Sequence, residues 1–317
     1  MFELHLRAVL AGMAARAKLR SVSGRLMERL IDEVASMLLA ENLPPTAHHV
    51  TRLVDNLAQM ADLSLKDRPF LRRQRHSLAL HFDLFAVQSE MLLDAPDDLI
   101  VGYTQTMMGF LLFQPAPSSI GMIGLGGGSL TKFCYRHLPL AAISVAEIDV
   151  EVIALRDEFC IPPDDERLKV QCVDGADFVS QTVDRFDVLL VDGFDKNGQP
   201  PQLCSQQFYD DCYRALAPGG ILVVNLLADE EEIGLYVDRL YTAFDDAVIV
   251  IDALDSMNKI AFACRGNALA MDGKTLRGYV NALRDDIPLV LDLTAKSLLS
   301  ARRARSFPAL FQSCDIA

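Results

Sequence analysis

Three observations in the sequence predict a doubly wound α/β fold with a mostly parallel sheet. Short apolar runs alternate with helical stretches after Pro115, as expected for parallel strands buried on both faces. Several of these runs end in glycine or an acid, at the strand ends where such sheets bind ligands. A glycine cluster, Gly124–Gly128, separates the first of these apolar runs from a helical stretch.

Length and composition agree with one large α/β core plus a smaller appendage. The chain has 317 residues, of which 51% are hydrophobic. The longest apolar stretch is too short to cross a bilayer, and Glu3, His5 and Arg7 stand where a signal peptide would be apolar. We therefore expect a soluble, cytoplasmic protein that does not bind membranes.

Charge and cysteine usage argue against nucleic-acid binding, a disulfide framework and a zinc site. The net charge of −13 opposes nucleic-acid binding and would concentrate a cationic small substrate. The 7 cysteines form no C-x-x-C pair, which argues against a disulfide framework and against a zinc site. We expect no metal.

The first part of the chain is predicted to be a helical extension, residues 1–76. Helical spacing of apolar residues runs to about residue 64, with Pro44-Pro45 between two helices. The basic cluster of residues 66–75 is typical of a solvated linker, the alternative being a phosphate or partner site.

A small β/helix segment on the substrate side, residues 77–114, is predicted next. Alternating apolar residues predict a strand over Ser77–Val87. The acids of Pro96-Asp97-Asp98 precede a predicted helix over Leu99–Phe113.

Residues 115–270 are predicted to form the nucleoside-binding domain. Its expected strands are Ile120–Gly124, Ala142–Glu147, Leu168–Val173, Phe186–Asp192 and Gly220–Leu227. Its expected helices are Leu130–His137, Val150–Phe159, Ala176–Gln181, Ser205–Ala215 and Glu230–Phe244.

Two last strands close the predicted sheet, Ala247–Ile251 and Lys259–Cys264. The loop between them is too short for a crossover helix, so they must pair as an antiparallel hairpin. A parallel sheet with such an edge is typical of Rossmann-like class I methyltransferase folds. Residues 271–317 are expected to be C-terminal helices, two of them from Lys274 onwards.

The glycine cluster and the acid Glu147 predict a site for an adenosine moiety. Glycines let the backbone approach a ligand and open a helix, while a strand-end acid accepts from ribose hydroxyls. Ser129, directly after the glycines, is typical of a helix N-cap as well as of a ligand contact. Asp149 is expected to cap the next helix.

Further acids stand at or just after strand ends, and they should converge with Glu147 on one crevice. They are Asp174, Asp192 and Asp195. Any one of them could equally be an N-cap or turn residue. The loop Gly193–Leu203 follows directly and either covers a bound substrate or is a plain surface connection.

The order and spacing of these motifs resemble the spermidine/spermine synthase family of polyamine aminopropyltransferases. The resemblance runs from about Leu78 to Arg265. The segments that carry it are Gly124–Gly128, Glu147-Ile148-Asp149, Val173-Asp174-Gly175, Val191–Asp195, Leu203 and Phe208-Tyr209, with Val87-Gln88-Ser89 and Tyr103-Thr104-Gln105 upstream.

The resemblance implies transfer of an aminopropyl group from decarboxylated S-adenosylmethionine to the amine of a polyamine. The nucleoside would be held by Gly124, Gly126, Gly127, Gly128, Ser129, Glu147, Asp174, Gly175 and Gln88. Within this set, Glu147 would hold the ribose hydroxyls and Asp174 the adenine amino group. Asp192 would be the general base, while Asp195 and Tyr103 would bind the acceptor. Relatives in the family commonly form homodimers.

Three departures from the family keep other functions open. The family has an aspartate where this chain has Ser129, and a proline where it has Lys196. The segment between Ile251 and Lys259 lacks the tyrosine that the family often places there. The alternatives are a methyltransferase or aminocarboxypropyl transferase that uses intact S-adenosylmethionine, and a non-catalytic relative. A nicotinamide dehydrogenase is least favoured, because it would leave the acids after Glu147 without a role.

Overall fold

The computed structural model describes residues 68–82, 87–195, 198–227, 232–254, 257–284 and 287–306. The chain divides into two compact units, residues 1–71 with 81–87 and residues 72–80 with 88–317. All of the predicted site residues belong to the second unit. The predicted N-terminal helices lie outside the described residues, and the predicted domain boundaries remain predictions.

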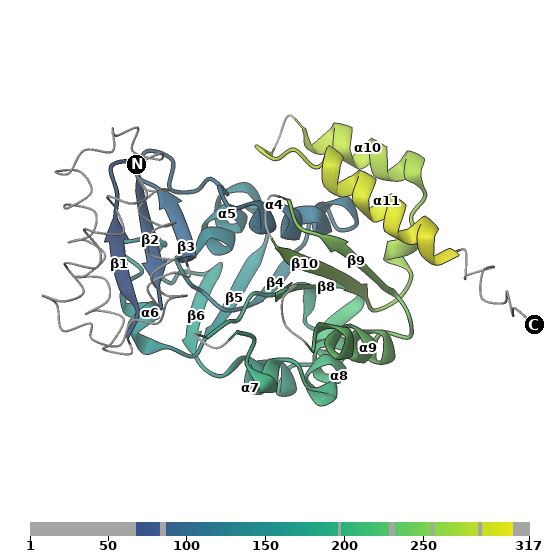
Figure 1. Ribbon diagram of the computed structural model, residues 1–317, viewed down its shortest axis with the longest axis horizontal. Coiled ribbons are helices and arrows are strands. Elements are labelled where there is room, and N and C mark those ends of the chain that lie inside the picture. Colours follow the sequence, from purple (N-terminus) through teal and green to yellow (C-terminus); the bar gives the residue numbers. More distant parts are fainter. Residues whose placement is uncertain are drawn as a thin grey trace, which may run out of the picture. The chain divides into compact units, whose positions relative to one another are not determined.

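A seven-stranded sheet forms the centre of the second unit, in the order β6-β5-β4-β7-β8-β10-β9 (Figure 1). Strands β4 to β8 pair in parallel, whereas β10 is antiparallel to both β8 and β9. The strands are β4 (Ser119–Ile123), β5 (Ala142–Glu147), β6 (Leu168–Cys172), β7 (Phe186–Val191), β8 (Leu216–Leu227), β9 (Val248–Asp252) and β10 (Asn258–Cys264). The predicted α/β fold class is confirmed, including the antiparallel hairpin of β9 and β10.

Helices connect the parallel strands, as the alternating pattern predicts. They are α5 (Ser129–His137), α6 (Val150–Ala154), α7 (Gly175–Ser180), α8 (Gln206–Ala215) and α9 (Ile233–Ala243). The short helix η2 (Pro201–Leu203) lies in the loop before α8. Helices α7, α8 and α9 lie side by side, each packed on the next (Figure 1). Helix α6 ends five residues before the predicted end at Phe159, and Cys160 then has a positive φ of 55°.

The C-terminal segment forms two helices, as predicted. Helix α10 (Gly273–Leu283) and helix α11 (Asp292–Ser306) pack side by side, and α11 also contacts β9 (Figure 1). The one-turn helix η3 (Ala268–Ala270) joins β10 to this pair. The predicted helix over Leu99–Phe113 is present as α4 (Gly102–Met107) and η1 (Met108–Leu112).

Two predictions for residues 66–87 are wrong. The basic cluster is not only a linker, because the short strand β1 (Phe70–Arg73) includes Arg72 and Arg73. The single strand predicted over residues 77–87 is replaced by β2 (Ser77–His81) and β3 (Val87–Leu92), which join β1 in a three-stranded sheet of order β1-β2-β3. Short strands that carry charged residues give little apolar alternation from which to predict them.

Neither a membrane span nor a metal cluster is found in the described ranges. No helix there is both long and apolar enough to cross a bilayer. No three His, Cys, Asp or Glu side chains in those ranges are grouped so that they could hold a metal ion.

Candidate active site

Asp192 is the first residue after β7, and its half-buried carboxylate receives hydrogen bonds from two other elements. The Tyr103 hydroxyl, on α4, donates to Oδ2 at 3.2 Å. The Asn225 side-chain amide, on β8, donates to Oδ1 at 2.8 Å. Burial raises the pKa of Asp192 above its ordinary value, against the opposing effect of these two donors. A fixed carboxylate with a raised pKa is suited to accept a proton.

Asn225 is itself held by two amides. Asn258, at the start of β10, donates from Nδ2 to Asn225 Oδ1 at 2.8 Å. Gln199, on the loop after β7, donates from Nε2 to the backbone carbonyl of Asn225 at 3.4 Å. Sequence reasoning missed all three amides. The signal for Asn225 was its position inside an apolar run, because a strand interior buries a polar side chain only when it has partners.

Tyr103, which the family resemblance implies binds the acceptor, contacts the Asp192 carboxylate. Burial raises the pKa of its hydroxyl well above the ordinary tyrosine value, and the neighbouring Asp192 carboxylate adds to that effect. Tyr103 is therefore protonated at neutral pH and able to donate to Asp192. This contact joins residues that are 89 positions apart in the chain.

Glu147 ends β5 and turns its carboxylate back toward the glycine loop. The backbone N–H of Leu125 donates to Oε2 and that of Asp149 donates to Oε1, both at 2.8 Å. Its side chain is buried. Each carboxylate oxygen can accept a further hydrogen bond, so Glu147 is oriented by the loop and still able to accept from a ligand hydroxyl.

The glycines of the loop are required mainly by the packing of the protein itself. A Cβ on Gly124, where φ is +91°, would lie 2.2 Å from the carbonyl oxygen of Asp192. A Cβ on Gly128, where φ is +67°, would lie 2.4 Å from Ile161, and one on Gly127 would lie 2.6 Å from Ser89 Oγ. Only at Gly126 would a Cβ meet nothing closer than 3.7 Å. The predicted contact with a ligand is therefore best accommodated at Gly126.

Ser129 is the first residue of α5 and not its N-cap, so that prediction is wrong. The cap position is Gly128, in the left-handed conformation and with no side chain to bond. The Ser129 hydroxyl instead lies 3.3 Å from the hydroxyl of Ser89 on β3. Gln88, the predicted nucleoside contact, precedes Ser89 and is half-buried.

Two other acids cap helices, as the simpler interpretation of a strand-end acid predicts. Asp149 accepts from the backbone N–H of Glu151 and caps α6. Asp174 caps α7 by accepting from Ala176 N at 2.7 Å, and its Oδ2 accepts from Gln202 Nε2 at 3.2 Å. The next residue, Gly175, packs so closely that a Cβ would lie 2.3 Å from Ile123.

Asp195 lies three residues beyond Asp192 in an exposed reverse turn. Its backbone exchanges two hydrogen bonds with Gly198, at 3.0 and 3.2 Å. Lys196, the next residue in the sequence, lies outside the described residues. Asp195 is thus exposed, whereas Asp192 is half-buried.

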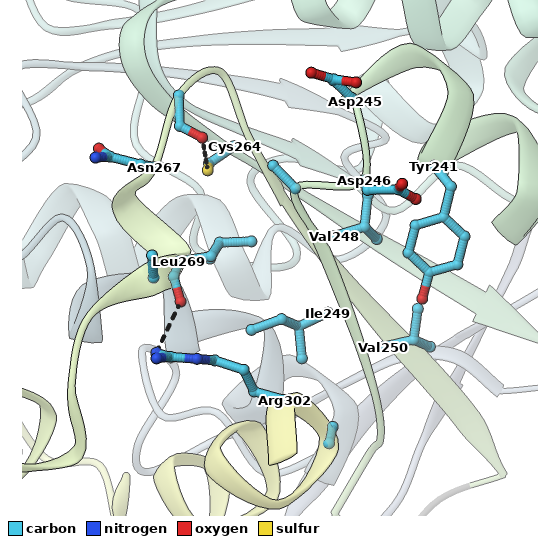
Figure 2. A pocket seen from close by; sticks show the side chains of 14 residues that line it. Tyr241, Asp245, Asp246, Val248, Ile249, Val250, Cys264, Asn267, Leu269 and Arg302 are labelled. Atoms are coloured by element: carbon cyan, nitrogen blue, oxygen red, sulfur yellow. Dashed lines mark hydrogen bonds between the residues drawn. The ribbon is translucent and has the colours of Figure 1, made fainter. Parts of the chain in front are cut away.

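A separate cavity of about 780 Å³ lies between α9, β9, η3 and α11 (Figure 2). It is lined by Tyr241, Ile249, Cys264 and Arg302 among others. Cys264 is at the far end of β10 from Asn258, so the cavity opens at the opposite end of the sheet from Asp192. It contains none of the predicted site residues.

The comparisons with known sequences all indicate the same family. A family model described as the spermine/spermidine synthase domain matches residues 101–233. A polyamine aminopropyltransferase of Chromobacterium violaceum is 36% identical over 206 residues, which are 65% of this chain and 79% of the relative. One of Neisseria meningitidis serogroup A is 36% identical over 177 residues, 55% of this chain and 67% of the relative.

Solved structures share the fold at low sequence identity. A probable spermidine synthase from Corynebacterium glutamicum superposes with a TM-score of 0.55 at 18% identity, over 77% of this chain and 95% of that one. Human methyltransferase-like protein 13, in complex with SAH, superposes with a TM-score of 0.51 at 20% identity, over 68% of this chain and 97% of that one. These neighbours support the methyltransferase-like architecture of the sheet.

Proposed function

The chain belongs to the spermidine/spermine synthase family and is a transferase, and from this membership we propose that it moves an aminopropyl group from decarboxylated S-adenosylmethionine to a polyamine amine. The polyamine aminopropyltransferases among its relatives support this reaction. The observation that supports the proposed chemistry is the Asp192 carboxylate, which Tyr103 and Asn225 hold in place at the carboxyl end of β7.

Asp192 would act as the general base. A polyamine nitrogen is protonated near neutral pH and cannot attack until it loses a proton. Transfer of that proton to Asp192 frees the nitrogen lone pair, which attacks the carbon beside the sulfonium. The C–N bond forms as the C–S bond breaks, and its electron pair stays on sulfur to give methylthioadenosine. Alignment of nitrogen, carbon and sulfur would supply much of the rate enhancement.

The nucleoside would lie across the glycine loop. Glu147 has oxygens free to accept from the ribose hydroxyls, and Gly126 leaves space for the ligand to approach the backbone. The remaining nucleoside contacts are proposed from the family resemblance, with Asp174 at the adenine amino group and Gln88 as a further contact. No metal takes part in the proposed reaction.

The acceptor would enter beside Asp195 and Tyr103. The exposed Asp195 carboxylate would bind a protonated amine, which the net charge of −13 also attracts. A second copy of the chain in a homodimer and a cytoplasmic location remain predictions.

A second function, transfer from intact S-adenosylmethionine, is supported by the neutral Ser129–Ser89 hydroxyl pair beside the glycine loop. A carboxylate at residue 129 would repel the carboxylate of the intact donor, and a serine does not. Such a protein would release S-adenosylhomocysteine as a methyltransferase, or methylthioadenosine as an aminocarboxypropyl transferase.

One assay separates these possibilities. The purified protein is incubated with putrescine, spermidine or cadaverine and with each donor in turn, and the nucleoside product is identified. Methylthioadenosine from the decarboxylated donor supports the proposal. If that donor gives none with any of the three amines, the polyamine assignment is wrong. A protein that binds the nucleoside but turns over neither donor is a non-catalytic relative.

A further inference from the structure

While Asp192 is ionised, the hydrogen bonds around it have only one possible direction. A carboxylate can only accept, so the Asn225 atom that faces Asp192 Oδ1 is its amide nitrogen. The remaining Asn225 oxygen can also only accept, and the Asn258 nitrogen donates to it. The chain of donors therefore runs from Asn258 through Asn225 to Asp192.

Strand register brings the two asparagines together. Asn225 pairs with Ile260, and Asn258 pairs with Leu227, on the antiparallel strands β8 and β10. The two asparagines are thus diagonal neighbours on one face of the sheet, within reach of each other's side chains. Asn225 is 1% exposed, so its amide has little access to water as an alternative partner.

The two oxygens of Asp192 differ as proton acceptors. Oδ1 faces an amide nitrogen, which has no lone pair to accept a proton that Oδ1 might carry. Oδ2 faces the Tyr103 hydroxyl at the longer distance of 3.2 Å, and a hydroxyl can rotate from donor to acceptor. A proton on Oδ2 can therefore keep its hydrogen bond to Tyr103, whereas a proton on Oδ1 would weaken the oxygen that accepts from Asn225.

We propose that Asn225 and Asn258 are positioning residues, in which Asn258 fixes the Asn225 amide so that Asp192 receives the substrate proton on Oδ2. This inference rests on the proposed role of Asp192 as base. It adds residues that bind neither donor nor acceptor and act only through Asp192.

Other charged groups near Asp192 stay the same when residue 258 is changed. Tyr103 is the titratable group in contact with Asp192, and burial keeps that hydroxyl protonated. Glu147 ends β5 and Asp174 follows β6, which lie two and three strands from β7 in the sheet, and Asp195 lies on the loop after Asp192. A change made at Asn258 can therefore be followed against a constant background.

The test is Asn258→Asp, measured by the pH profile of kcat/KM for putrescine with the decarboxylated donor. An aspartate at 258 can only accept, so the single Asn225 amide nitrogen can donate to only one of the two carboxylates. We expect it to turn toward residue 258, which leaves the Asn225 oxygen toward Asp192. The Asp192 carboxylate then loses a donor and faces an acceptor. We expect the acidic limb to move up by about one pH unit or more, which is about a tenfold lower kcat/KM on that limb.

The same change in an Asn225→Leu background separates the effect of the turned Asn225 amide from the direct effect of the new charge. With no amide to turn, Asn258→Asp should move the limb less than it does in the wild type. Asn267→Asp adds an equal charge at the other end of β10, beside the cavity of Figure 2, and should leave the limb in place. An equal shift in both backgrounds, or no shift, overturns the inference.

If Asn258→Asp does not fold, Asn258→Ala is measured in its place. It removes the donor without adding charge, and should move the limb in the same direction by a smaller amount, again only when Asn225 is present. Failure of the proposed function would look different. Wild-type protein would then release no methylthioadenosine, or Asp192→Asn would keep the acidic limb.

Discussion

Lys132 is a buried lysine behind the glycine loop, and its titration should be visible in the stability of the protein. It lies on α5, is 1% exposed, and donates from Nζ to the carbonyl of Phe159 at 2.8 Å. The Phe159 ring lies against Gly127, where a Cβ would be 2.9 Å away. We take Lys132→Met as the perturbation, because methionine keeps the length of the side chain and removes its charge.

The expected magnitude follows from the pKa of Lys132. Burial lowers this pKa from its ordinary value of 10.5 to about 8, against the smaller opposing effects of Cys160 and Asp97. At about 1.4 kcal/mol per pH unit, the charged form is disfavoured in the folded state by up to about 3 kcal/mol. Relaxation of the surrounding structure reduces the penalty for a buried charge, so we expect about 1 to 3 kcal/mol.

The sign follows from proton binding. Between pH 8 and 10.5 the unfolded chain keeps the lysine proton while the folded protein loses it. The Lys132 contribution to the free energy of unfolding therefore rises with pH through that window. Wild-type stability minus Lys132→Met stability should increase by about 1 to 3 kcal/mol from pH 7.5 to pH 10.5.

Urea unfolding followed by far-ultraviolet circular dichroism measures this difference, since the chain has no tryptophan for fluorescence. Subtracting the two stabilities removes the contributions of tyrosines and cysteines that titrate in the same pH range in both proteins. Lys169→Met, at an exposed position on β6, is the matched control and should follow the wild-type curve. Parallel curves for wild type and Lys132→Met would refute the reasoning.

Three further variants probe the site. Asp192→Asn should lower kcat by about a hundredfold or more while methylthioadenosine affinity, measured by calorimetry, stays nearly intact; unchanged turnover removes Asp192 as base. Ser129→Asp should weaken binding of intact S-adenosylmethionine by carboxylate repulsion, and equal affinity would show that residue 129 does not face the donor's tail. Gly124→Ala should lower both the melting temperature and turnover, because its Cβ would meet the Asp192 backbone at 2.2 Å. The control Gly278→Ala, with nothing within 4 Å, should be neutral or stabilising by up to about 1 kcal/mol, and equal losses in both would contradict this account.

Much of the sheet could be predicted from the sequence because each buried strand is a continuous apolar run with a sharp end. The predicted strand Ala142–Glu147 agrees with β5 at both ends. The position of β10 between β8 and β9 could not be predicted. A short loop requires β9 and β10 to pair, but it does not determine which of them also pairs with β8.

The candidate site also contains residues that could be predicted from the sequence and residues that could not. Acids at strand ends could be found, since parallel strands bring their carboxyl ends to one edge of the sheet. The amides Asn225 and Asn258 could not, because they meet only through the register of β8 with β10. The role of Ser129 also depended on a backbone angle, the left-handed Gly128 before it, that the sequence does not show.

Gly124 links the glycine loop to the proposed base. Its N–H donates to Ala146, just before Glu147, while its missing side chain makes room for the carbonyl of Asp192. Asp192 in turn donates its backbone N–H to Ile123 at 2.9 Å. The glycine loop and the proposed base are therefore joined directly through the backbone. The first glycine of the cluster is better explained by this contact than by direct contact with a ligand, and Gly124→Ala should for that reason affect proton transfer as well as nucleoside binding.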